Sequence, residues 1–233
     1  NAVTFHDVEA LLLQQQRLEV LNRVLRHNIR TETNLIAGYA ELIEEGEEEG
    51  IDELIKERAE RIEVMGEQAR EIAELFDREE RAEEPVPLAA IVDEAVTSVR
   101  DRYPDVTVDS GPIPKDVTVS AVLRPVVSNV LENAAEHNSS DQPRVGVQVE
   151  AGAETVTLAI EDNGPGISAY ERAVLERGTE TPLEHGSGLG LWLIKWGVGF
   201  AGGRLSLEEN EPSGTVVTIE VPIAETTGSV QRA

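Results

Sequence analysis

The chain has 233 residues, of which 45 are acidic and 20 basic, with a formal net charge of −25 and no cysteine. The missing cysteines exclude disulfides and thiolate metal sites, and the acidic balance argues against nucleic-acid binding, which needs clustered lysine and arginine. No run of 18 apolar residues occurs, so no membrane-spanning helix and no membrane contact are predicted for this segment.

The acidic residues are spread along the chain instead of forming a tail, and only three of the basic residues are lysines. Such a surface repels itself in dilute buffer, whereas salt at about 1 M screens charges to about 3 Å. We therefore expect a halophilic protein, from an organism with a molar-salt cytoplasm such as a haloarchaeon. An ordinary acidic protein is the alternative.

Residues 5–45 are predicted to form one long helix, because leucines recur at seven-residue spacing in two interleaved series. The first series is Leu11, Leu18 and Leu25, and the second is Leu21, Leu35 and Leu42, with Asn28 in its gap. Gly46 and Gly50 mark a turn, and a second helix is predicted over 51–81 from apolar residues at steps of three and four.

Two such helices form a hairpin, which cannot enclose a core alone. We therefore expect a homodimer in which two hairpins, residues 1–82, make a four-helix bundle. The segment 83–87 contains two prolines and is predicted to be a linker.

After the linker, helical and strand patterns interleave. Helices are predicted near 88–102, 121–137, 168–177 and 188–200, and strands near 105–109, 116–119, 144–150, 155–161, 203–209 and 214–221. This order favours an α+β class with a two-layer sandwich over residues 88–224, followed by a tail at 225–233.

Asp162 follows an apolar strand, and Gly164 and Gly166 come two and four residues later. A carboxylate at a strand end can accept a hydrogen bond from an exocyclic amino group, and glycines let the backbone approach a flat base. A plain turn is the alternative, because Asn-Gly-Pro-Gly is turn chemistry.

A second glycine cluster, with Gly186, Gly188 and Gly190, precedes an apolar helical segment. Backbone N–H groups and the positive end of a helix dipole there favour a phosphate site, with a hinge loop as the alternative. The spacing fits neither a P-loop nor the dinucleotide fingerprint.

Asn129 and Asn133 lie one helical turn apart, and His137 follows one turn later on the same face. Asparagine is a poor helix former, so two inside one helix need a reason. Their side-chain oxygens suit Mg²⁺, which keeps several waters and bridges phosphates. Capping or a polar surface is the alternative.

These three segments, in this order, resemble the N box and the two glycine boxes of sensor histidine kinases. The resemblance extends to a wider superfamily with a Bergerat-type ATP site, which includes gyrase, a heat-shock chaperone and a mismatch-repair ATPase. It implies a mixed sheet backed by helices, with ATP and Mg²⁺ as cofactors under a lid at about 177–187.

The resemblance also implies a role for each matching residue. Asn133 would hold Mg²⁺ through ATP, with Asn129 as a second candidate and His137 beside them. Asp162 would contact adenine, next to Gly164 and Gly166. The triphosphate would lie along Gly186, Gly188, Leu189 and Gly190. Hydrolytic members of the superfamily carry Glu at position 129, and Asn129 cannot act as a base for water, which favours phosphotransfer.

His27 lies in the first helix, in a stretch similar to the family's H box. A neutral imidazole is a competent nucleophile at neutral pH, so His27 is the predicted phosphoacceptor, with a surface histidine as the alternative. The family usually has an acidic residue after the acceptor, where this chain has Asn28. Thr31 matches the position that often serves the phosphatase reaction, and Glu32 replaces a frequent proline.

We therefore predict a cytoplasmic protein-histidine kinase, whose upstream part could be sensory or membrane-attached. It would phosphorylate His27 from ATP and pass the phosphoryl group to an Asp of a response-regulator receiver domain. The alternatives are a nucleotide-binding scaffold or pseudokinase, a Bergerat-type ATPase, and a regulator phosphatase that uses Thr31.

Overall fold

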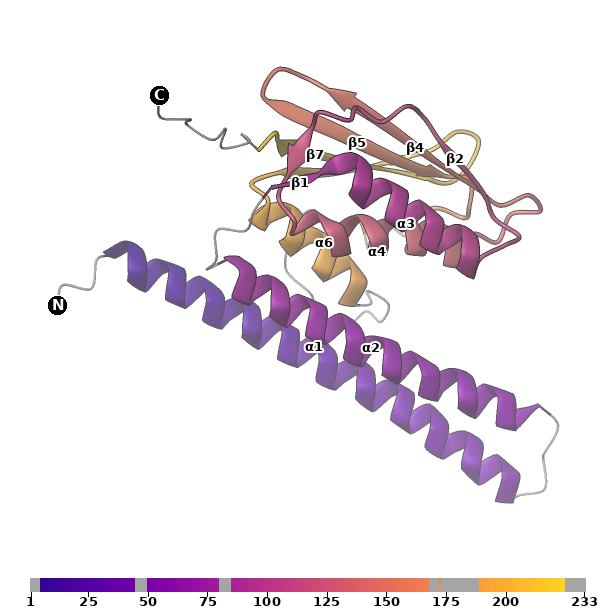
Figure 1. Ribbon diagram of the computed structural model, residues 1–233. Coiled ribbons are helices and arrows are strands. Elements are labelled where there is room, and N and C mark those ends of the chain that lie inside the picture. The colour runs from indigo at the N-terminus through magenta and orange to yellow at the C-terminus, as the bar shows by residue number, and fades with distance from the viewer. Residues whose placement is uncertain (1–4, 45–49, 80–84, 168–171, 173–188, 225–233) are drawn as a thin grey trace, which may run out of the picture. The chain divides into compact units, whose positions relative to one another are not determined.

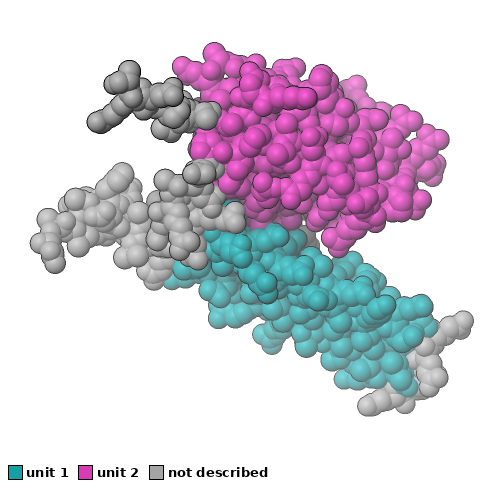
Figure 2. All heavy atoms as spheres, in the orientation of Figure 1, with its two compact units in different colours: residues 1–76 teal, residues 77–233 magenta. Residues whose placement is uncertain are grey.

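The computed structural model describes residues 5–44, 50–79, 85–167, 172 and 189–224 (Figure 1). The chain divides into two compact units, residues 1–76 and 77–233 (Figure 2). The predicted tail and most of the helix expected near 168–177 lie outside the described residues. No helix in the described ranges is both long and apolar enough to cross a bilayer.

The first unit is the predicted helical hairpin, formed by α1 (Phe5–Glu44) and α2 (Ile51–Glu79) (Figure 1). Gly50 precedes α2 with a φ of 76°, a conformation that favours glycine. Asp52 and Glu53 in the first turn of α2 complement the positive end of its dipole. Buried apolar residues occur on both helices, and they are Leu21, Val24, Ile51, Ile72 and Leu75.

The second unit contains a five-stranded sheet in the order β2-β4-β5-β7-β6. Its strands are β2 (Thr107–Ser110), β4 (Arg144–Ala151), β5 (Thr155–Asp162), β6 (Arg204–Glu209) and β7 (Thr215–Pro222). β2 pairs with β4 in parallel, and every other pair is antiparallel. The sheet is therefore mixed, as the family resemblance implies.

Among the described residues, three helices cover one face of this sheet, namely α3 (Leu88–Arg102), α4 (Leu123–Glu136) and α6 (Leu189–Phe200) (Figure 1). Alternate residues of β5, which are Val156, Leu158 and Ile160, are buried and pack in one apolar core with residues of the helices. This alternation is typical of a strand with one face on a core. The second unit is thus the expected two-layer α+β sandwich.

A second, two-stranded sheet pairs β1 (Val86–Pro87) with β3 (Thr118–Val119). Val86 and Pro87 were expected in the linker, because prolines suggest a break. The backbone N–H of Leu88 also donates to the carbonyl oxygen of Val117 at 3.0 Å. Proline is tolerated in such a short strand at a sheet edge. Val86 and Pro87, the last two residues of the expected linker, are therefore part of the folded second unit.

Candidate functional site

Asn129 and Asn133 face each other on α4, as their spacing predicts. The Asn133 Nδ2 donates to Asn129 Oδ1 at 3.1 Å, which leaves the Asn133 amide oxygen as the remaining acceptor of that side chain. Asn129 is 6% exposed, and Asn133 is half-buried. Because the buried Asn129 amide accepts this hydrogen bond, it can orient the Asn133 side chain.

Gly190, at the start of α6, packs directly on Asn129. A Cβ atom at position 190 would lie 2.7 Å from Asn129 Oδ1 and 3.3 Å from its Nδ2. Only glycine fits so close to this side chain. The structure therefore brings the end of the second glycine cluster to the asparagine pair on α4, although 60 residues separate them in sequence.

Asp162 is the last residue of β5, and its carboxylate is held by the backbone that follows it. The N–H of Gly164 donates to Asp162 Oδ1 at 2.8 Å. The N–H of Thr215, in the adjacent strand β7, also bonds this carboxylate. Burial raises the pKa of Asp162, and these two hydrogen bonds act in the opposite direction. The site thus presents a half-buried carboxylate oriented by two backbone donors.

Thr215 and the turn before β7 are parts of the site that sequence reasoning missed. Thr215 is 3% exposed, and Asn210 Nδ2 donates to the carbonyl oxygen of Asp162 at 2.8 Å. Gly214 has a φ of 119°, and a Cβ there would collide with the same carbonyl. The segment Asn-Glu-Pro-Ser-Gly predicts a turn, but nothing in it indicates which strand end the turn contacts.

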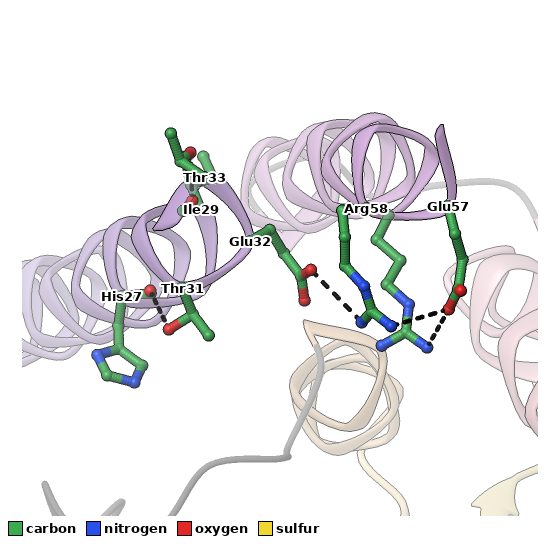
Figure 3. Close-up of polar contacts among 8 residues, drawn as sticks. His27, Ile29, Thr31, Glu32, Thr33, Glu57 and Arg58 are labelled. Carbon is green, nitrogen blue, oxygen red and sulfur yellow. Dashed lines mark hydrogen bonds and ion pairs between the residues drawn. The ribbon is translucent and has the colours of Figure 1, made fainter. Parts of the chain in front are cut away.

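His27 and Thr31 lie one turn apart on α1, and both are in the described part of the chain (Figure 3). The His27 side chain is exposed. Thr31 Oγ1 donates to the backbone carbonyl oxygen of His27 at 3.1 Å. The hydroxyl therefore lies on the same turn of helix as His27, and its hydrogen is engaged by the backbone in this state.

Glu32 and Arg58 join the two helices of the hairpin through an ion pair (Figure 3). The Arg58 Nη1 lies 3.6 Å from Glu32 Oε2, and the two side chains are 17% and 10% exposed. Arg58 also contacts Glu57 on its own helix, at 3.2 Å. Glu32 replaces the proline frequent in the family, and α1 continues through it without interruption.

The remaining predicted residues divide into two groups. His137 is exposed and forms the C-cap of α4, where its backbone N–H donates to the carbonyl oxygen of Asn133 at 3.2 Å. Leu189 is fully buried at the start of α6. Gly186, Gly188 and the expected lid at 177–187 lie outside the described residues.

Comparisons with known proteins give the family of the chain. Residues 118–225 match the family of histidine kinase-, DNA gyrase B- and HSP90-like ATPases. Over 218 residues, which are 91% of this chain and 41% of the relative, the chain is 30% identical to the sensor-type histidine kinase PrrB of Mycobacterium tuberculosis. The chain belongs to the sensor histidine kinase family. Residues 118–225, within the second unit, are its ATPase-family domain.

Other relatives support the same assignment. The chain is 31% identical over 224 residues to the histidine-protein kinase/phosphatase MprB of Mycolicibacterium vanbaalenii, covering 89% of this chain and 46% of that protein. It thus spans less than half the length of these curated kinases.

Solved structures extend the comparison to the fold. A mycobacterial MprB structure matches with a TM-score of 0.51 and 34% identity, covering 60% of this chain and 97% of that one. A structure of the histidine kinase AdeS of Acinetobacter baumannii covers 85% of this chain and 98% of its own, with a TM-score of 0.60. At 20% identity, AdeS supports the fold alone. A helical hairpin followed by the α+β domain is therefore a known arrangement for the fold.

Proposed function

We propose that this kinase core binds ATP with Mg²⁺ in its second unit and transfers the γ-phosphoryl group to His27. The observation that carries the proposal is the joining of the asparagine pair on α4, Gly190 of α6 and Asp162 of β5 in one domain of the ATPase family. An acceptor histidine on the helical hairpin supplies the second half of the reaction.

The adenine would be recognised by Asp162. Its carboxylate, fixed by the Gly164 and Thr215 N–H groups, accepts a hydrogen bond from the exocyclic amino group. Gly164 and Gly166 have no side chain, so the backbone after Asp162 can pass close to the base. Both positions are crowded, since a Cβ at Gly164 would lie 3.0 Å from Asp162 Oδ1 and one at Gly166 would lie 3.3 Å from the Gly214 carbonyl oxygen.

The residues present fit a magnesium ion bound through the nucleotide. The free oxygen of the Asn133 amide is a hard neutral ligand, and no group of three or more His, Cys, Asp or Glu in the described residues could cage a metal. Mg²⁺ would therefore be shared between Asn133, phosphate oxygens and water. When bound, it neutralises charge that develops on the phosphates during transfer.

Transfer to His27 breaks the bond between the γ-phosphorus and the oxygen bridging to the β-phosphate. A phosphorus–nitrogen bond forms to the imidazole, the imidazole N–H proton passes to solvent water, and ADP departs. Asn28 cannot accept that proton, and the residues one turn from His27 on α1 are Arg23, Val24, Arg30 and Thr31, none of them a carboxylate. Asn129, likewise, offers no base for water, so transfer is favoured over hydrolysis.

The hairpin is proposed to pair with a second copy of itself. Large apolar side chains remain exposed along both helices, and they are Leu18, Leu35, Leu42, Ile43, Leu54 and Val64. Leu35 and Leu42 belong to the predicted seven-residue series, which is the spacing expected of a bundle seam. A second hairpin would cover them. The onward partner would be the receiver domain of a response regulator.

The test is incubation of the protein with γ-labelled ATP and Mg²⁺ in molar KCl. We expect acid-labile, base-stable label on the wild type and none on His27→Gln, while both bind a non-cleavable ATP mimic equally. Label that persists in His27→Gln refutes the acceptor assignment. Nucleotide binding without label on the wild type favours the scaffold, and phosphate release without label favours an ATPase.

A second candidate activity is dephosphorylation of the regulator. Thr31 lies one turn after His27, with its hydroxyl on that turn of the helix. A relative at 31% identity is named a kinase/phosphatase. In this activity the Thr31 hydroxyl would orient a water, after leaving its hydrogen bond to the His27 carbonyl.

A further inference from the structure

Asn163 lies between two parts of the proposed nucleotide site, namely the asparagine pair on α4 and Asp162 at the end of β5. We propose that Asn163 is a positioning residue that fixes the end of α4, and with it the asparagine pair that faces Mg²⁺, against the strand end that carries the adenine carboxylate. The inference rests on the proposed function, and it adds a residue that touches neither nucleotide nor metal.

The Asn163 side chain is a hydrogen-bond hub for the loop that follows α4. Its Oδ1 accepts from Asn138 Nδ2 at 3.0 Å, from Ser140 Oγ at 3.3 Å and from the Arg144 N–H at 2.8 Å. Its Nδ2 donates to the Gln142 carbonyl oxygen at 2.9 Å. Both ends of the amide are therefore satisfied, and this side chain contacts four residues of the 138–144 loop. The Asn138 side chain adds bonds of its own, to the Arg144 carbonyl oxygen and from the Ser140 N–H.

Asn138 connects the Asn163 side chain to the end of α4. It comes one residue after the C-cap His137, and its backbone N–H donates to the Ala135 carbonyl oxygen at 3.4 Å. Its Cα would lie 3.3 Å from a Cβ at Gly164, so the end of the helix packs on the first glycine of the Asp162 loop. A shift of this helix end would therefore move Asn133, one turn earlier, relative to Asp162.

The backbone carbonyl of Asp162 is held by other contacts. Asn210 Nδ2 donates to the Asp162 carbonyl oxygen, and Gly214 packs on the same carbonyl. These contacts come from the β6–β7 turn and not from the α4 loop. Asn210 is thus a matched control for Asn163: both are half-buried asparagines that brace one strand end, but only Asn163 connects it to α4.

If Asn163 positions Asn133 through α4, substitutions at the two residues should have non-additive effects on nucleotide affinity. A double-mutant cycle pairs Asn163→Ala with Asn133→Ala and measures the Kd of a non-cleavable ATP mimic with Mg²⁺ by calorimetry. We expect Asn163→Ala to weaken binding about tenfold. We also expect the effect of Asn133→Ala to fall about threefold or more in that background. Asn210→Ala should weaken binding but combine additively with Asn133→Ala. Additive behaviour of the Asn163 pair overturns the proposal.

The conservative variant and a nucleotide-free measurement complete the test. Asn163→Asp keeps the oxygen that accepts three hydrogen bonds but loses the donor to the Gln142 carbonyl oxygen, so it should restore part of the coupling. Without nucleotide, hydrogen exchange should speed up over 131–144 in Asn163→Ala and only over 208–216 in Asn210→Ala. Unchanged exchange over 131–144 overturns the proposal even if affinity falls. A wild type that binds no ATP mimic refutes the proposed function, and the exchange result then still decides whether Asn163 holds α4.

Discussion

The side chain of Asn129 lies against the backbone of Gly190 with no room for a methyl group between them. A Cβ at position 190 would come within 2.7 Å of Asn129 Oδ1, and Asn129 is itself buried. Real Cβ atoms do not approach oxygen so closely, so any side chain at this position must displace the amide. The contact joins α4 to the start of α6.

Gly190→Ala is therefore expected to weaken binding of the Mg²⁺-nucleotide about tenfold or more, because the displaced Asn129 can no longer orient Asn133. Calorimetric titration with an ATP mimic measures the change. Gly199→Ala is the control, because Gly199 lies on the same helix and nothing lies within 4 Å of its Cβ position. That substitution should leave binding unchanged and stabilise α6 by about 0.5–1 kcal/mol. Equal affinities of the two variants would refute this explanation.

Asp162→Asn should keep or raise the stability of the fold while it lowers the affinity for nucleotide. Burial raises the folded-state pKa of Asp162 above its unfolded value, so its favourable contribution is present at acidic pH and is lost as pH rises through the folded-state pKa. At neutral pH the ionised carboxylate therefore costs stability. We expect Asp162→Asn to keep or raise the midpoint of thermal unfolding at pH 7, with the gain shrinking as pH falls, and to lose nucleotide affinity. Exposed Asp141→Asn is the control, and a lower midpoint at pH 7 would contradict the prediction.

The ion pair between Glu32 and Arg58 should behave as a buried pair. A single long contact holds it, and within the described residues Glu32 Oε2 and Arg58 Nε have no hydrogen-bond partner. Removing one charge leaves the other buried, so Arg58→Met is expected to cost about 3 kcal/mol in the free energy of unfolding. Glu32→Leu with Arg58→Met should recover most of it. Arg61→Met breaks an exposed pair with Glu57 and should cost less than about 1 kcal/mol.

Thr31→Ala should leave autophosphorylation of His27 within about twofold of wild type, because the hydroxyl donates its hydrogen bond to the backbone in this state. Dephosphorylation of the cognate regulator should be lost, and Thr31→Ser, which keeps the hydroxyl, should retain it. The two rates are measured separately, with labelled kinase and with labelled regulator. Regulator dephosphorylation that survives in Thr31→Ala would rule out the hydroxyl as the group that orients water.

Stability is expected to rise with salt. Between 0.1 M and 1 M KCl the screening length falls from about 10 Å to about 3 Å, which weakens repulsion within a chain of net charge −25. The midpoint of thermal unfolding should therefore increase over this range. A neutral osmolyte at equal osmolality serves as the control. If it stabilises the protein equally, charge screening is not the cause.

Most of the fold could be predicted from local patterns. The helix over 88–102 matches α3 residue for residue, and β4, β5, β6 and β7 begin or end within one residue of their predicted bounds. Hydrophobic periodicity fixes these elements because each has one face on a core. β1 was missed because two residues are too short to show a period, and its pairing with Thr118–Val119 is a tertiary contact.

The parts of the candidate site that depend on the local spacing of glycines and asparagines were predicted from the sequence. The parts that depend on contacts between neighbouring strands were missed. The pairing of Asn129 with Asn133 follows from helical spacing, and the structure shows it. The roles of Thr215 and Asn210 could not be predicted, because β7 lies beside β5 through a pairing between residues about 60 positions apart. Local patterns do not encode which strands become neighbours.

The place of β7 between β5 and β6 has a consequence for synthesis. β5 gains β4 as a neighbour early, but its other edge stays open until residues 215–222 have left the ribosome. Until then Asp162 lacks the Thr215 donor, and a long apolar strand exposes unpaired backbone. A nascent chain stalled before that point would therefore lack one of the two donors that orient the proposed adenine carboxylate, and it would be prone to pair with other chains.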